Sequence, residues 1–82
     1  MTTEESRNII LQAAALNARG KHWDALELVH LNLPQFDPAL RFDGLKELFQ
    51  AALGIGDKRL AVTVAEEIAQ EFPDMPSIQD YL

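Results

Sequence analysis

The chain has 82 residues, no cysteine and a formal net charge of −6, and 48% of its residues are hydrophobic while 24% are charged. This balance excludes a disordered chain, and the length allows one domain with a thin core. Because cysteine is absent, disulfides and thiolate metal sites are excluded, and nothing in the composition indicates an oxidising compartment. We expect a single cytoplasmic domain over residues 1–82.

The first helix is predicted over residues 3–19, where apolar residues recur at helical spacing. Thr2 followed by Glu5 has the pattern of a capping box at its start. Gly20 is expected to end the helix, because a residue without Cβ readily takes the left-handed conformation that closes helices. The apolar positions of this helix are Ile9, Ile10, Ala13, Ala14 and Leu16.

A second helix is predicted from about His22 to Leu33, where Pro34 stops it because proline has no backbone N–H donor. Trp23, near its start, is expected to anchor the first hairpin against the third helix, since a buried aromatic contributes a large apolar area. The alternative is that Trp23 is an energetic hot spot for a partner. The apolar positions are Trp23, Ala25, Leu26, Leu28, Val29 and Leu33.

Asp37 and Pro38 predict the start of a third helix, because the carboxylate can accept from free N–H groups and the proline suits the first helical position. The helix is expected to run to Leu53 or Gly54. Gly44, in its middle, is predicted to cost about 1 kcal/mol relative to alanine. The inward positions are Phe42, Leu45, Leu48, Phe49 and Ala52.

The fourth helix is predicted over residues 57–72, after a turn at Gly56 and before Pro73. Ser77 is expected to cap a short helical turn in the tail, residues 73–82. The chain thus divides into a hairpin at about 3–33, a hairpin at about 38–72 and this tail. The apolar positions of the fourth helix are Ala61, Val64, Ala65, Ile68 and Phe72.

The two hairpins repeat one pattern: Gly20 with Ala25, and 36 residues later Gly56 with Ala61. Residues 42–74 resemble a tetratricopeptide repeat, a helix–turn–helix of about 34 residues, and residues 6–38 resemble it more weakly. The fold class expected is all-α, with two stacked tetratricopeptide-like hairpins; a generic antiparallel four-helix bundle is the alternative. The matching positions are Leu45, Leu48, Phe49, Ala52, Ala61, Ala65 and Pro73.

The resemblance implies a non-enzymatic scaffold that binds other proteins through outward groups of its first and third helices. Two repeats are fewer than the three or so that usually stand alone, so an apolar end should stay exposed. We expect a partner to cover it, either a second copy, a tight heterodimer partner or an amphipathic helix, at the flank of the fourth helix and the tail. The residues expected to bind are Asn8, Gln12, Arg41, Lys46, Gln50, Ile78, Tyr81 and Leu82.

The negative charge is concentrated at the C-terminal end, because residues 60–82 hold five acidic residues and no basic one. Such a field repels phosphate backbones, so direct binding of nucleic acid is not expected. The ordinary interpretation is a solvated face that keeps the protein soluble. The acidic surface is expected to comprise Glu66, Glu67, Glu71 and Asp74.

Three functions fit these features. The first is a small chaperone or adaptor, similar in size and charge to chaperones of bacterial type III secretion. The second is a phage-type inhibitor whose acidic surface blocks a basic, nucleic-acid-binding partner. The third is an accessory subunit of an enzyme complex. Salt-sensitive competition with DNA would favour the inhibitor, and salt-insensitive capture of an apolar helix would favour the chaperone.

No catalytic, cofactor or metal motif is predicted. Glu27 and His30 have the Glu-x-x-His spacing of di-metal helical bundles, but such a site needs a second copy of the pair, and the sequence has none. Ser6 and Ser77 lie near predicted helix starts, where capping explains them better than nucleophilic catalysis. A membrane span is not expected either, because the longest uncharged stretch, residues 8–18, is far shorter than about 20 residues.

Overall fold

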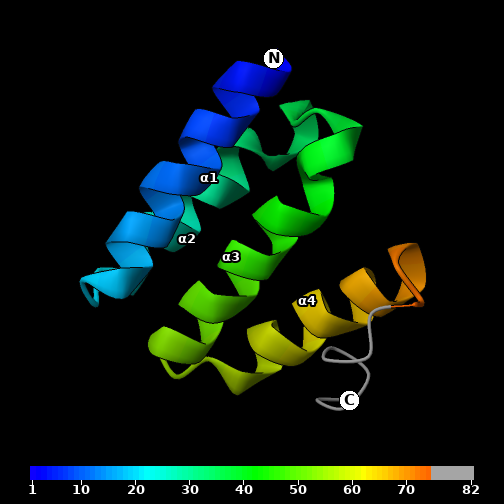
Figure 1. The fold of residues 1–82 in the computed structure, drawn as a ribbon. Coiled ribbons are helices and arrows are strands. Elements are labelled where there is room, and N and C mark those ends of the chain that lie inside the picture. The colour runs from blue at the N-terminus through cyan, green and yellow to red at the C-terminus, as the bar shows by residue number, and fades with distance from the viewer. Residues whose placement is uncertain (75–82) are drawn as a thin grey trace.

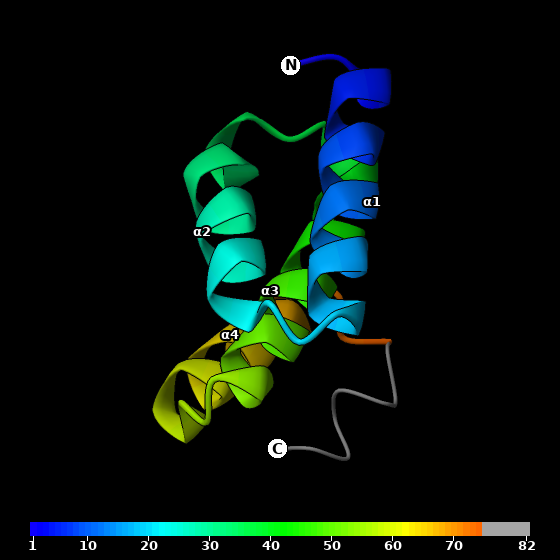
Figure 2. The ribbon, with the colours of Figure 1, turned by 90° about the vertical axis from the view of Figure 1, so that its left-hand side faces the viewer.

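The computed structural model describes residues 1–74, and all the regular secondary structure in them is helical (Figure 1). Within these residues, four α-helices and two short 3-10 helices follow one another. Figure 2 shows the first two helices side by side, running in opposite directions. The elements are α1 (Thr3–Ala18), α2 (His22–Asn32), η1 (Leu33–Gln35), η2 (Pro38–Leu40), α3 (Arg41–Gly54) and α4 (Lys58–Glu71).

The start of α1 has the predicted capping box. The backbone N–H of Glu5 donates to the Thr2 hydroxyl at 3.1 Å, and the backbone N–H of Thr2 donates to the Glu5 carboxylate at 2.9 Å. Both bonds satisfy N–H groups that have no partner within the helix. These contacts lower the pKa of the Glu5 carboxyl, with the Thr2 backbone N–H as the main cause.

The two predicted glycine turns are the same motif. Gly20 and Gly56 have φ values of +78° and +79°, which place both in the left-handed region. After α1, the N–H of Lys21 donates to the carbonyl of Leu16, and the N–H of Gly20 donates to that of Asn17. After α3, Asp57 and Gly56 make the same pair of bonds, to the carbonyls of Ala52 and Leu53. Both helices therefore end in a Schellman motif, so the pattern that repeats in the sequence also repeats in the structure.

The connection between the hairpins differs from the prediction. The second helix ends at Asn32 and not at Leu33, and the third begins at Arg41 and not at Pro38. Pro34 lies within the 3-10 helix η1, and Pro38 begins the 3-10 helix η2. A residue without a backbone N–H cannot continue the hydrogen-bond ladder of an α-helix. Asp37 does cap as expected, since its carboxylate accepts from the N–H of Ala39 at 2.9 Å.

Ser6 is fully buried and does not cap a helix, contrary to the prediction. Its hydroxyl accepts a hydrogen bond from the backbone N–H of Asp37 at 3.1 Å, which joins α1 to the connection between the hairpins. The Thr3 hydroxyl donates to the Asp37 carboxylate at the same place. This hydroxyl, together with the N–H of Ala39, lowers the pKa of the Asp37 carboxyl.

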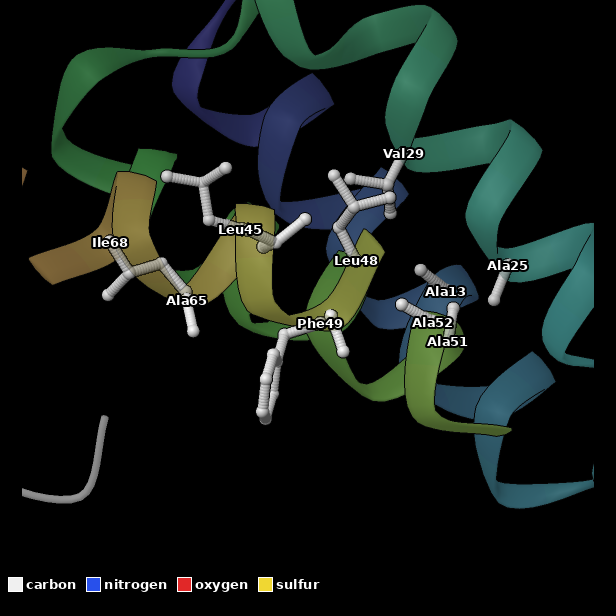
Figure 3. Close-up of a cluster of buried hydrophobic side chains, with 12 residues drawn as sticks. Ala13, Ala25, Val29, Leu45, Leu48, Phe49, Ala51, Ala52, Ala65 and Ile68 are labelled. Atoms are coloured by element: carbon white, nitrogen blue, oxygen red, sulfur yellow. The ribbon is translucent and has the colours of Figure 1, made fainter. Parts of the chain in front are cut away.

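The core is built around α3, which contacts α1, α2 and α4. Figure 3 shows apolar side chains of all four helices meeting around this central helix. The inward row that the sequence predicts for α3 is confirmed at Leu45, Leu48, Phe49 and Ala52, whereas Phe42 is only half-buried. The buried core residues are Ala13, Ala25, Val29, Leu45, Leu48, Phe49, Ala51, Ala52, Ala61, Val64, Ala65 and Ile68.

Gly44 is not simply a weak point of α3. A Cβ placed on it would lie 2.3 Å from Cε2 of the Phe36 ring, which is itself buried. The missing side chain therefore allows the η1–η2 connection to pack directly against the α3 backbone.

Trp23 is 69% exposed, so the prediction that it anchors the hairpin in the core is wrong. The buried side of α2 is marked by Ala25 and Val29, which are both fully buried. Trp23 precedes Ala25 by two positions, or about 200° of helical rotation, and so points away from the core.

The helix α4 packs on α3 and on no other described helix. Four residues of its predicted apolar row, Ala61, Val64, Ala65 and Ile68, are buried. The fifth, Phe72, is half-buried, and its ring meets that of Phe42 edge to face, with centroids 5.2 Å apart. The helix α3 covers this row, while Val62, also on α4, is 39% exposed. The expectation that a partner covers a flank of this helix and the tail stays a prediction. The predicted tail turn at Ser77 lies outside the described residues.

Candidate binding groove

A groove of about 340 Å³ lies between α1 and α2. No residue of α3 or α4 lines it, so the first hairpin forms it alone. The lining residues are Gln12 and Leu16 of α1 and Asp24, Glu27, Leu28, Leu31 and Asn32 of α2.

The base of the groove follows from how α1 and α2 meet. Ala13 and Ala25 are both fully buried where the hairpin joins the core, and such small side chains allow two helices to approach closely. Leu16 and Leu28 flank this contact, half-buried and packed against the core. Leu31, at the outer edge of the groove, is 65% exposed. The groove thus has an apolar base that is not fully covered by the chain.

The rim of the groove is polar and acidic. Asp24 and Glu27 are exposed and, in the described part of the chain, neither has a hydrogen-bond or ion-pair partner. Asn32 donates to the carbonyl of Leu28 at 2.8 Å, so this amide is already engaged within α2. Gln12 is exposed on the α1 side. The rim therefore offers two free carboxylates and no positive charge.

The hairpin is held on α3 by a polar cluster at its turn. The Asn17 amide donates to the Glu47 carbonyl at 3.1 Å and to the Glu47 carboxylate at 3.0 Å. Its oxygen lies 2.9 Å from Nδ1 of His22, and Nδ1 is the donor because an amide oxygen can only accept. The His22 ring also lies where a Cβ on Gly54 would be, so α2 and α3 approach closely here. This cluster fixes the end of the groove without entering it.

The structure does not bring the predicted binding residues to one place. Gln12 lines the groove, whereas Lys46 and Gln50 are exposed on α3, which contributes nothing to it. Arg41 donates through Nε to the Glu71 carboxylate at 2.7 Å and so joins the start of α3 to the end of α4. The predicted tail residues Ile78, Tyr81 and Leu82 lie outside the described residues, and Asn8 is exposed on α1.

The predicted acidic surface is solvent-exposed at Glu66, Glu67, Glu71 and Asp74. It is partly neutralised by Arg41. The pKa of Arg41 is raised mainly by its hydrogen bond with Glu71, and the negative charge of Glu67 also contributes. The Arg41–Glu71 pair is about one-third exposed on each side, so solvent screens it strongly.

Sequence reasoning missed the groove, although one signal for it was present. Leu31 lies outside the apolar row predicted for α2, as a large apolar residue on a side that should be polar. Together with Leu28 it indicates a second, narrower apolar strip along this helix. Trp23 lies on the exposed side too, one helical turn before Glu27.

No protein-family model, curated protein or solved structure matches this chain. None of the helices in residues 1–74 is long and apolar enough to cross a membrane. Within the same residues, no three side chains of His, Cys, Asp or Glu gather in a way that could hold a metal ion.

Proposed function

We propose that this protein is a non-enzymatic interaction module that binds an amphipathic helix of a partner protein in the groove between α1 and α2. The observation that carries the proposal is the apolar lining of that groove that the chain leaves uncovered, above all Leu31, which is 65% exposed. Amphipathic helices bind in such grooves by placing one apolar row against a complementary apolar strip. The roles of small chaperone and adaptor both follow from this binding mode.

A tetratricopeptide-like stack is part of the proposal. Two features support it: the same Schellman turn closes α1 and α3, and α3 contacts both helices of the first hairpin. In such a stack each hairpin buries its apolar surface against the next one. Among the described α-helices, the first hairpin packs only on α3, and the groove is one apolar surface that this arrangement leaves uncovered.

The chemistry of the groove favours binding over catalysis. Its polar groups are two carboxylates, Asp24 and Glu27, and two amides, Gln12 and Asn32. The serine and histidine residues of the described chain do not line it. Ser6 is engaged at the connection between the hairpins, and His22 is engaged with Asn17. A groove of this composition can hold an apolar strip and orient its polar edges, but it has no nucleophile beside a base.

The test uses a synthetic leucine-rich amphipathic peptide with glutamine on its polar side and no tryptophan. Trp23 is the only tryptophan of the chain and is exposed one turn from the groove, so its fluorescence reports a helix bound there. We expect saturable binding with a shift of Trp23 emission to shorter wavelength.

The matched variants are Leu31→Gln and Leu11→Gln. Leu31 and Leu11 are 65% and 60% exposed, but only Leu31 lines the groove. We expect Leu31→Gln to weaken peptide binding about tenfold, because it places an amide against the apolar row, and Leu11→Gln to leave binding unchanged. Equal effects of the two substitutions on peptide binding would refute the proposal.

A further inference from the structure

On the basis of the proposed function, we propose that the helix bound in the groove is cationic. Its apolar row lies on Leu16, Leu28 and Leu31, and lysine or arginine side chains beside that row face Asp24 and Glu27. The occupant is thus a basic amphipathic helix of another protein.

The charge of the groove rim supports this choice. Both charged residues that line the groove are acidic, and neither forms an ion pair with another residue in the range 1–74. A neutral apolar helix would bring apolar atoms close to these carboxylates and remove part of their hydration, which opposes binding. A helix with cations at its edge replaces that hydration with charge-assisted hydrogen bonds.

Only one of the two carboxylates stabilises the fold through the dipole of α2. Asp24 lies in the first turn of α2, where a negative charge is favourable because it faces the positive end of the helix dipole. Glu27 lies beyond the first turn and has no partner in the described structure. The Glu27 carboxylate is therefore free to pair with a cation of the bound helix.

The spacing of the carboxylates suggests the pattern of the partner. Asp24 and Glu27 are three positions apart on one helix, so their Cβ atoms lie roughly 5–6 Å from each other on the same side. Two cations three or four positions apart on a bound helix have a similar separation. We expect a partner segment with basic residues at such spacing beside a leucine-rich or similar apolar row.

A second copy of this chain is a poor occupant. The net charge of −6 opposes association at an acidic groove, and the exposed side of α4 adds Glu66 and Glu67. Like charges brought together at an interface reduce both the rate and the strength of association. Another protein with a basic segment can pair its cations with the carboxylates of the groove. Self-association instead places further negative charge next to these carboxylates.

The experiment compares three tryptophan-free peptides that share one leucine row and carry lysine, glutamine or glutamate beside it. Binding to the full chain is followed by Trp23 fluorescence at low and high salt. We expect the lysine peptide to bind about tenfold more tightly than the glutamate peptide at low salt, and the difference to shrink as added salt screens the charges.

Two double variants with equal charge changes locate the effect. Asp24→Asn with Glu27→Gln neutralises the rim, and Glu66→Gln with Glu67→Gln removes the same charge from α4. The rim variant should lose most of the preference for lysine over glutamate, while the α4 variant should keep it. The single variant Glu27→Gln, which leaves the helix start unchanged, should lose part of the preference, and circular dichroism checks that each variant is folded.

The outcomes separate the two proposals. One outcome is that Leu31→Gln weakens binding of the glutamine peptide, but the lysine and glutamate peptides bind equally well. The proposal of a cationic partner is then refuted, and the proposal that the groove binds an amphipathic helix stands. If the α4 variant loses the preference as much as the rim variant, the effect is one of net charge, and the cationic partner is again refuted. If none of the peptides binds, the proposed function itself fails.

Discussion

Trp23 and Leu45 illustrate that size and apolarity alone do not place a residue in the core. Leu45 lies on α3, the helix that contacts all the others, and is fully buried. Trp23 is the largest side chain of the molecule but lies on the outward side of α2. Its area remains available to a partner, whereas that of Leu45 is used in folding.

The substitution Trp23→Ala should therefore change the free energy of unfolding by less than about 1 kcal/mol, because an exposed side chain leaves no cavity. Leu45→Ala should cost about 2–5 kcal/mol, a large part of the stability of so small a domain. Urea denaturation followed by circular dichroism measures both values. A loss of several kcal/mol on Trp23→Ala would mean that the indole is buried in solution.

Gly44→Ala gives a second prediction for a single residue, because helix propensity and packing have opposite effects on the free energy of unfolding. Propensity favours alanine by about 1 kcal/mol in a helix interior. Packing opposes it, since the new Cβ would lie 2.3 Å from the Phe36 ring, and moving a buried ring typically costs about 1–3 kcal/mol. We expect a net loss of stability in thermal or urea unfolding. Gln50→Ala, at an exposed position of the same helix, is the control that should be neutral or slightly stabilising, and a stabilising Gly44→Ala would contradict the Phe36 contact.

At the scale of the element, α1 depends on its capping box for the start of the helix. Glu5 has a lowered pKa in the folded protein because it accepts from the backbone N–H of Thr2. A carboxyl with a lowered pKa stabilises the fold when it is ionised, and this contribution is lost as the pH falls through the folded-state pKa. The same direction holds for Asp37.

Glu5→Ala should therefore lower the melting temperature at neutral pH, and the gap to the unmodified protein should shrink as the pH falls through the lowered pKa of Glu5. Glu4→Ala removes the same charge from the same turn, but the Glu4 side chain makes no hydrogen bond in the described structure. Melting curves from pH 2.5 to 7 measure the gap for both variants. Identical pH profiles for the two would show that the capping box is not formed.

At the scale of the whole molecule, the helices are not equally supported. The central helix α3 contacts three helices, whereas α4 contacts only α3 among the described helices. Local opening of α4 breaks the packing between two helices only. Opening of α3 breaks its packing against all three other α-helices and therefore requires the whole domain to unfold.

Native-state hydrogen exchange should therefore find the slowest amides in α3 and distinctly faster exchange in α4. The measurement is made by NMR on the full chain, with the interior amides of each helix compared. Equal protection of α3 and α4 would contradict this order, because it would mean that the domain opens only as one unit.

The parts of this fold that sequence predicts well are those set by local chemistry. The capping box, both glycine turns and the buried rows of α3 and α4 depend on residues within one or two helical turns, and they are confirmed except at Phe42 and Phe72, which are only half-buried. The errors come from distant contacts. The orientation of Trp23 depends on which side of α2 meets α3, and the role of Gly44 depends on where the Phe36 ring lies. The groove was missed for the same reason, because its base exists only once two helices have packed.

The central claim, that the groove between α1 and α2 is the binding surface, is tested most directly by NMR chemical-shift mapping. A lysine-bearing amphipathic peptide is titrated into the labelled full chain. The claim predicts that the largest shifts fall on Gln12, Leu16, Glu27, Leu28 and Leu31, with little change along the exposed side of α4. Shifts that centre on Glu66, Glu67 and Glu71 instead would contradict it, since the acidic surface and not the groove would then be the site.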